Sequence, residues 1–261
     1  MNAVKRAIYP LISFTAVLLL WELSIRVFHI PNYILPDLSQ VLKALRFGYI
    51  EGHYWPHLGF TLCATLTGYL LGSSLAIVIG AVLAEVPTAD RFIYPLIIAI
   101  QSMPKVALAP LIIVWFGFGI ESKIIMVALI CFFPVFVNVL SGLRSVDQNL
   151  VDMMRICGCS RFDILLQVKL PHAAGAIFSG LQIAVVLGLI GAIVGEFIAS
   201  TQGLGFLIQA GSNALDLGSV FAGLVSLAVI GICGTQLLRL LHSRIVFWDR
   251  KVATSSVSFE S

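Results

Sequence analysis

The chain has 261 residues, of which 59% are apolar and only 11% are charged, and its formal net charge is +3. A soluble domain carries about 25% charged residues, so this composition excludes an ordinary water-soluble enzyme. The small positive charge also excludes a protein that binds along nucleic-acid phosphates. We therefore expect an all-α polytopic membrane protein.

Six apolar runs are each long enough to cross the roughly 30 Å hydrocarbon core of a bilayer, which takes about 20 helical residues. Their approximate bounds are 8–28, 58–85, 92–117, 122–143, 176–199 and 218–241. Backbone groups in lipid must bond internally, and the alternation of a membrane β-barrel is missing from the sequence, so these runs are predicted helices. One membrane domain is expected over residues 1–252, followed by a disordered Ser-rich tail at 253–261.

The distribution of Lys and Arg predicts the orientation, because these residues accumulate in cytoplasmic segments. With the N-terminus inside, eleven of the 16 lie in inner segments, and the outer segments hold Arg26, Lys43, Arg46 and Lys123. Lys105 falls within the third run. Both termini are therefore expected to face the cytoplasm, with the first run kept as an uncleaved span because no small-residue cleavage site follows it.

The outer connection, 29–57, contains a predicted short helix after Pro36. Its apolar residues recur at helical spacing, which indicates a helix lying on the outer membrane surface. A lid that contacts substrate is the alternative. The motifs Gly68-x3-Gly72 and Gly191-x3-Gly195 place small residues on one face of a helix, which predicts close approach between spans.

The inner connection, 144–175, reads as a short helix, a break and a second helix. Gly158 is able to take the left-handed conformation that ends a helix, and Ser160 is able to cap the next one. Leu150, Met153, Met154 and Cys157 form an apolar stripe at helical spacing. Such a helix either docks into a groove of another protein or anchors the loop to the membrane surface, and the residues alone leave both open.

This connection resembles the signature of ABC importer permeases, E-A-A-x3-G-x9-I-x-L-P. The matching or replacing residues are Asp152 for Glu, Met153 and Met154 for Ala-Ala, Gly158 for Gly, Val168 for Ile, and Leu170-Pro171 for Leu-Pro. Segments 103–111, 115–119 and 194–197 look like permeases for nitrate, sulfonates, taurine and bicarbonate. The resemblance extends from residue 35 to about residue 241.

The resemblance implies the type I ABC importer permease fold, with six transmembrane helices in a bacterial inner membrane. It implies a second permease copy in a homodimer, a cytoplasmic ATPase dimer that holds ATP and Mg²⁺, and an extracytoplasmic solute-binding protein. The residues that would contact the ATPase are Leu150, Asp152, Met153, Met154, Gly158, Leu170 and Pro171. The sequence has no Gly-Lys-Ser/Thr, so this chain is expected to bind no nucleotide and to be no enzyme by itself.

Polar residues within the spans are candidates for a translocation path. They are Gln101, Lys105, Asn138, Gln182 and Glu196. Ionisable side chains are costly in hydrocarbon and usually face the bundle interior or a water-filled path. Lys105 either attracts an anionic substrate or makes an internal structural pair, and Glu196 either forms an outer gate or a structural hydrogen bond.

Two alternatives are weaker on sequence grounds. An ion- or proton-coupled secondary transporter often carries internal repeats, and no convincing repeat is visible. A membrane enzyme is disfavoured because neither a His-Glu-x2-His nor a Gly-x-Ser-x-Gly motif occurs. Cys157 and Cys159 lack the four ligands of a structural zinc site, so we expect packing thiols and no metal.

Overall fold

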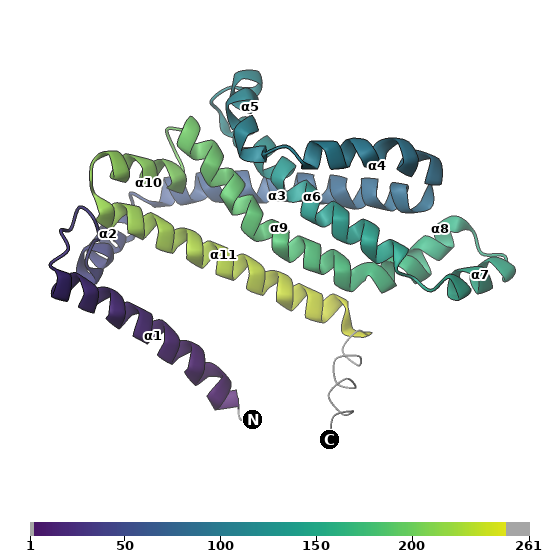
Figure 1. Cartoon of the computed structure of the whole chain (residues 1–261), viewed down its shortest axis with the longest axis horizontal. Coiled ribbons are helices and arrows are strands. Elements are labelled where there is room, and N and C mark those ends of the chain that lie inside the picture. The colour runs from purple at the N-terminus through teal and green to yellow at the C-terminus, as the bar shows by residue number, and fades with distance from the viewer. Residues whose placement is uncertain (1–2, 249–261) are drawn as a thin grey trace.

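A computed structural model, which describes residues 3–248, consists of long helices with short helices gathered at both ends (Figure 1). In chain order these are α1 (Ala3–Phe28), α2 (Leu38–Ile50), α3 (Trp55–Glu85), α4 (Pro87–Gln101), the 3₁₀ helix η1 (Lys105–Leu108), α5 (Ala109–Phe116), α6 (Ile120–Arg144), α7 (Gln148–Ile156), α8 (Arg161–Ile164), the π-helical turn η2 (Leu165–Lys169), α9 (Leu170–Ile198), α10 (Leu204–Asn213) and α11 (Leu217–Ile245). The predicted tail at 253–261 lies outside the described residues.

The all-helical membrane architecture is confirmed. Within the described part of the chain, four helices are long and apolar enough to cross a membrane: α3, α6, α11 and the continuous rod Arg161–Ile198. The bent pair formed by α4 with η1 and α5 raises the number to five. The count of six, which also needs α1, stays a prediction.

The core forms where α6 packs between α3 and α9. Its fully buried side chains are Val127, Cys131, Val135, Phe136 and Val139. The predicted small faces allow this close approach. A Cβ atom added at Gly68 would lie 2.5 Å from the carbonyl oxygen of Ile124, and one at Gly191 would lie 3.3 Å from the Cα of Val127.

The predicted third span, 92–117, is not one straight helix. α4 ends at Gln101, and the pair 87–101 and 105–116 is bent by 86°. Pro104 explains the break, because proline lacks an N–H donor and disfavours helical backbone at the residue before it. Pro110 then lies in the first turn of α5, where a proline is tolerated.

The predicted fifth span begins earlier than residue 176. The second helix of the inner connection continues through η2 into α9 without a break. Pro171 would clash with the Gln167 carbonyl in a regular α-helix, and a π-helical turn just before it relieves this contact. The inner connection is therefore shorter than predicted, and its far end is part of a membrane rod.

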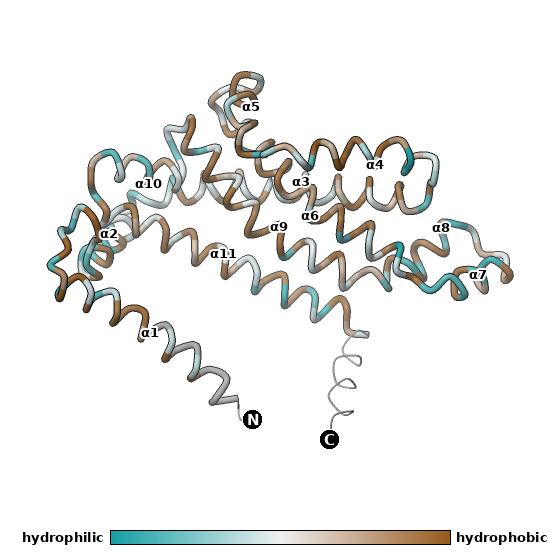
Figure 2. Tube along the Cα trace, in the orientation of Figure 1, coloured by the Kyte–Doolittle hydropathy of each residue, from teal (hydrophilic) through white to brown (hydrophobic). Residues whose placement is uncertain are grey.

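Polar residues concentrate at the two ends of the long axis, with apolar helices between them (Figure 2). One end carries α7 and α8, and it is the end that the distribution of Lys and Arg predicts to face the cytoplasm. The other carries α10 and the predicted outer helix, found as α2 and packed against α11. α1 diverges from α11 toward its N-terminus (Figure 1), and the Trp21 indole near its other end donates to the Pro36 carbonyl oxygen at 3.1 Å.

Replacing Gly68 by Val is expected to lower the thermal unfolding temperature, because the new side chain meets Ile124 and Val127 of α6. A loss of about 1–3 kcal/mol is typical of overpacking. The matched control is Gly59→Ala on the same helix, where a Cβ atom would meet nothing within 4 Å. Thermal unfolding in detergent measures both variants, and equal stability of Gly68→Val and the native chain would contradict this packing.

Candidate functional site

The bend between α4 and α5 opens a pocket of about 500 Å³ beside α6 and α9. Its lining is mainly apolar with three polar side chains. The residues are Gln101, Met103, Pro104, Lys105, Val106, Ile130, Phe133, Pro134, Val137, Asn138, Leu187 and Ile190. A largely apolar pocket with a few convergent polar groups is typical of a small-molecule site.

Lys105 supplies the positive charge of this pocket. Its Nζ donates a hydrogen bond to the Gln101 carbonyl oxygen at 3.3 Å and lies 4.5 Å from the centre of the Phe133 ring. Among residues 3–248, no carboxylate lies within 4.0 Å of it. The ammonium group is thus held by a carbonyl and an aromatic face, and its charge stays available to an anion.

The structure brings together three of the five predicted path residues: Gln101, Lys105 and Asn138. The amide of Asn138 donates to the Pro134 carbonyl oxygen at 2.8 Å. Gln182 lies on α9, is half-buried and does not line this pocket.

Glu196 lies apart from the pocket, fully buried where α9, α3 and α10 meet. Its carboxylate accepts hydrogen bonds from the Thr61 hydroxyl and from the Gly205 backbone N–H, each at 2.7 Å. Gly205 belongs to the first turn of α10, where a negative charge is favourable. Glu196 therefore fixes the start of α10 after the chain reverses.

Lys123 is the residue that the sequence reasoning missed. It was expected in an outer segment, yet it is fully buried near the start of α6. Its ammonium group donates to the Phe118 carbonyl oxygen at 2.8 Å and to the carbonyl oxygen of Ala199, the C-cap of α9. The local pattern contained no signal for this role, because a lysine at the edge of a span ordinarily reaches the interface.

The predicted break in the inner connection is confirmed. α7 ends at Ile156, and Gly158 adopts φ +82°. The N–H groups of Gly158 and Cys159 bind the carbonyls of Arg155 and Met154, the pattern of a Schellman cap. Ser160 and Asp163 form a reciprocal capping box that starts α8.

α7 presents an apolar face to the surroundings at the end that is predicted to be cytoplasmic. Leu150, Met153 and Ile156 are 43%, 52% and 88% exposed, whereas Val151 on the opposite face is buried. Asp152 is held locally by Arg155 at 3.0 Å. Cys157 is exposed, so the prediction of a packing thiol there is wrong. It lies just beyond the last turn of α7, in the break before α8.

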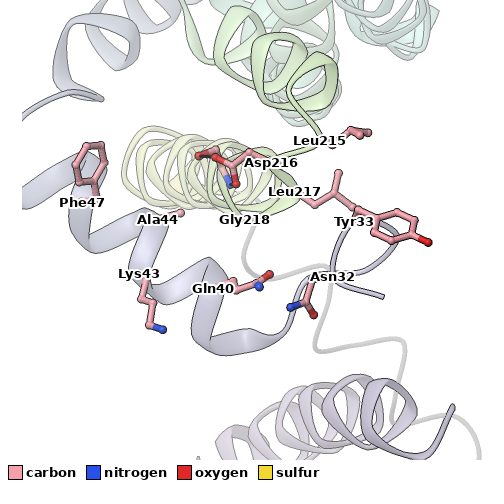
Figure 3. A pocket seen from close by; sticks show the side chains of 11 residues that line it. Asn32, Tyr33, Gln40, Lys43, Ala44, Phe47, Leu215, Asp216, Leu217 and Gly218 are labelled. Carbon is pink, nitrogen blue, oxygen red and sulfur yellow. Dashed lines mark hydrogen bonds between the residues drawn. The ribbon is translucent and has the colours of Figure 1, made fainter. Parts of the chain in front are cut away.

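A second hollow, of about 650 Å³, lies at the opposite end (Figure 3). α2 forms one side, and the α10–α11 turn forms the other. The lining residues are Asn32, Tyr33, Gln40, Lys43, Ala44, Phe47, Leu215, Asp216, Leu217, Gly218 and Ser219. Asp216 caps α11 by accepting from Ser219, and Leu215 has φ +56°, a left-handed conformation that is uncommon for a residue other than glycine.

Comparisons with known proteins agree with this geometry. The model of a family described as "Binding-protein-dependent transport system inner membrane component" matches residues 68–247. The chain is 30% identical over 246 residues to the formylaminopyrimidine transport permease protein ThiX of Halalkalibacterium halodurans, covering 94% of this chain and 98% of that protein. It is 32% identical over 223 residues to the taurine transport system permease protein TauC of Escherichia coli, covering 84% and 81%.

A solved structure shares the fold. One chain of the MetNI methionine ABC transporter, in an inward-facing conformation, matches with a TM-score of 0.59 at 17% identity. The match covers 73% of this chain and 98% of that chain. The type I importer fold implied by the sequence resemblance is therefore confirmed.

Replacing Lys123 by Met is expected to destabilise the protein, because it leaves the buried carbonyl oxygens of Phe118 and Ala199 without their donor. Leaving a buried polar group without its hydrogen-bond partner costs about 1–3 kcal/mol. Lys43→Met, on the exposed side of α2, is the control and should be neutral. Thermal unfolding in detergent distinguishes the two variants, and a Lys123→Met protein as stable as the native chain would contradict the proposed role of the network.

Proposed function

Because the chain belongs to the family of binding-protein-dependent transport inner membrane components, the permeases of ABC importers, we propose that it forms the solute path of such an importer as one of two identical copies. A cytoplasmic ATPase dimer would bind ATP and Mg²⁺, and a solute-binding protein would deliver the substrate. The observation that carries the proposal is the exposed apolar face of α7 at the cytoplasmic end.

α7 suits docking into a groove of the ATPase. A helix of nine residues that exposes Leu150, Met153 and Ile156 cannot bury this face against its own chain. Large exposed apolar side chains bounded by charged ones are typical of a protein interface. Met153 and Met154 replace the small residues of the family signature, and their flexible side chains favour a wider or more adaptable groove.

The coupling step would be a rigid-body movement. ATP binding would bring the two ATPase subunits together, and the docked α7 helices would move with them. The spans would then alternate between outward and inward access, because each nucleotide state of the ATPase binds one arrangement more tightly. This chain would contribute no catalytic group to ATP hydrolysis.

The first experiment is a gentle purification of the tagged chain from its native membrane, with mass spectrometry of the associated proteins. An ATPase of the cassette type in equal amount supports the proposal. A chain that purifies alone through several detergents would contradict it and favour the secondary transporter. Where a solute-binding protein purifies together with the chain and the ATPase, that binding protein would be tested for ligands.

Gly158→Asp is expected to leave the chain in the membrane but to lower ATP-dependent uptake about tenfold, equivalent to about 1.4 kcal/mol. The reason is that an unpaired carboxylate would be buried in the docked interface. Gly158→Asn is the matched control, since both side chains tolerate left-handed backbone and nothing lies within 4 Å of the added Cβ atom. Uptake into reconstituted vesicles is measured for both. Normal uptake by Gly158→Asp, or equal loss in both, would contradict the docking role.

The pocket at the helix bend is the proposed solute path, and Lys105 makes a small anion the proposed substrate. Lys105 is the only cationic side chain in the lining. The named relatives transport formylaminopyrimidine and taurine, of which taurine carries a sulfonate. A sulfonate, nitrate or carboxylate group would pair with the ammonium group, while the apolar lining would hold the rest of the molecule.

Lys105→Met is expected to raise the half-saturating concentration of an anionic substrate about tenfold, because it removes the pocket's only cation. Lys105→Arg keeps the charge and should retain most of the uptake. Uptake of radiolabelled taurine by the assembled complex is the assay, with gel filtration to verify assembly. Unchanged affinity and rate in Lys105→Met would exclude Lys105 from the path.

The hollow in Figure 3 is the proposed receiving surface for the solute-binding protein. It lies at the end opposite α7, and it combines exposed aromatic side chains with charged and amide groups. Tyr33 and Phe47 are 60% and 52% exposed. Exposed aromatic residues of this kind are enriched at protein interfaces.

A further inference from the structure

Two ion pairs fasten both ends of the α7–α8 segment to one turn. Arg144, the last residue of α6, lies 2.6 Å from Asp90 of α4, and Lys169, the last residue of η2, lies 2.5 Å from Glu85 of α3. Glu85 ends α3, and α4 begins at Pro87. The segment between Arg144 and Lys169 is therefore held on entry and on exit by the α3–α4 turn.

The two pairs differ in burial. The side chains of Lys169 and Glu85 are 14% and 19% exposed, so most of their surface is removed from water. Those of Arg144 and Asp90 are 44% and 26% exposed. The Arg144 guanidinium group also lies 5.8 Å from the centre of the Tyr94 ring on α4. Exposed ion pairs contribute little, but removing one partner of a shielded pair leaves an uncompensated charge.

α4 connects this turn to the pocket. The helix runs for 15 residues from Pro87 to Gln101, which corresponds to about 22 Å. Gln101 lines the pocket, and its carbonyl oxygen accepts the hydrogen bond from Lys105. α4 contains Pro95, which removes one backbone hydrogen bond between its two ends. A tilt at the Asp90 end that passes beyond Pro95 displaces the Gln101 end, and with it the ammonium group of Lys105.

η2 lies between α8 and α9, where a change in the position of α8 relative to α9 would be accommodated. The π-helical turn spans Leu165–Lys169, between α8 and the long α9. Single π-helical turns within α-helices frequently occur at functional sites. Next to it, a groove of about 350 Å³ separates α8 from the end of α3, lined by Ala81, Val82, Glu85, Val86, Arg161, Phe162 and Leu165. This space leaves room for α8 to move relative to α3 while Lys169 stays paired.

We propose that Glu85, Asp90, Arg144 and Lys169 are positioning residues that transmit movement of the α7–α8 segment through α4 to the pocket at Gln101 and Lys105. The proposal rests on the proposed function, since it assigns a route to the coupling between ATPase and solute path. On this proposal, the position of the α3–α4 turn depends both on the α7–α8 segment and on the pocket at Gln101 and Lys105.

The test uses the full complex of permease, ATPase and binding protein in vesicles, and it measures solute transported per ATP hydrolysed. The variants are Glu85→Gln, Lys169→Gln and the exchange Glu85→Lys with Lys169→Glu. Each single variant is expected to assemble and hydrolyse ATP but to lower this ratio at least about fivefold, the lower end of typical allosteric coupling. The exchanged pair is expected to recover at least about half of it, because the attraction is restored with opposite signs. Asp90→Asn and Arg144→Gln disrupt the more exposed pair and should lower the ratio in the same direction but by less.

The control removes an ion pair elsewhere. Glu22→Gln disrupts the 2.7 Å pair with Arg26 on α1 and should leave the ratio unchanged. An unchanged ratio in assembled Glu85→Gln and Lys169→Gln complexes would overturn the proposal. So would a loss of assembly that the exchanged pair repairs without restoring the ratio, since the pairs would then only support the fold. A native complex without ATP-dependent uptake would instead overturn the proposed function, and the route with it.

Discussion

A bilayer interior supplies no hydrogen bonds, so every backbone group exposed by a break in a helix must find a partner within the protein. Two such breaks meet at the outer end of the bundle, and Lys123 serves both. Its ammonium group binds the carbonyl of Phe118 before α6 and that of Ala199 after α9. Glu196 completes the arrangement by binding the first turn of α10 through Gly205. One buried cation and one buried carboxylate thus let the chain reverse direction there.

The two ends of the bundle are fastened differently. At the end predicted to face outward, Lys123 and Glu196 are fully buried and bind backbone groups at the ends of α6, α9 and α10. At the cytoplasmic end, the pairs Arg144–Asp90 and Lys169–Glu85 join side chains that still contact water. Breaking the first arrangement costs far more than shifting the second. Movement driven from the cytoplasm is therefore expected to be accommodated near the α3–α4 turn and η2, while the outer connections keep their form.

Local patterns in the sequence predicted local structure well. Hydrophobic run lengths identified the long helices, and Gly158 and Ser160 marked where α7 ends and α8 begins, because caps depend on neighbouring residues. Residues 92–117 were expected as one span, and the 86° bend within them was not predicted, because its angle depends on what packs beside it. The partners of Lys123 and the pairing of Glu85 with Lys169, 84 residues apart, were not predictable, since periodicity carries no information about contacts between distant helices.

The chemistry of the pocket also explains why a permease of this kind would rely on a separate binding protein. A site within a transport path must bind strongly enough to admit a solute and weakly enough to release it. The polar lining is one ammonium group, already bound in part by a carbonyl oxygen and the Phe133 ring, the Asn138 amide, which donates to Pro134, and the Gln101 amide. Such a lining recognises the negative charge of a solute and does not distinguish one anion from another. Selectivity among anions would then be set before the solute reaches the membrane, and the pocket would need only to accept what is delivered.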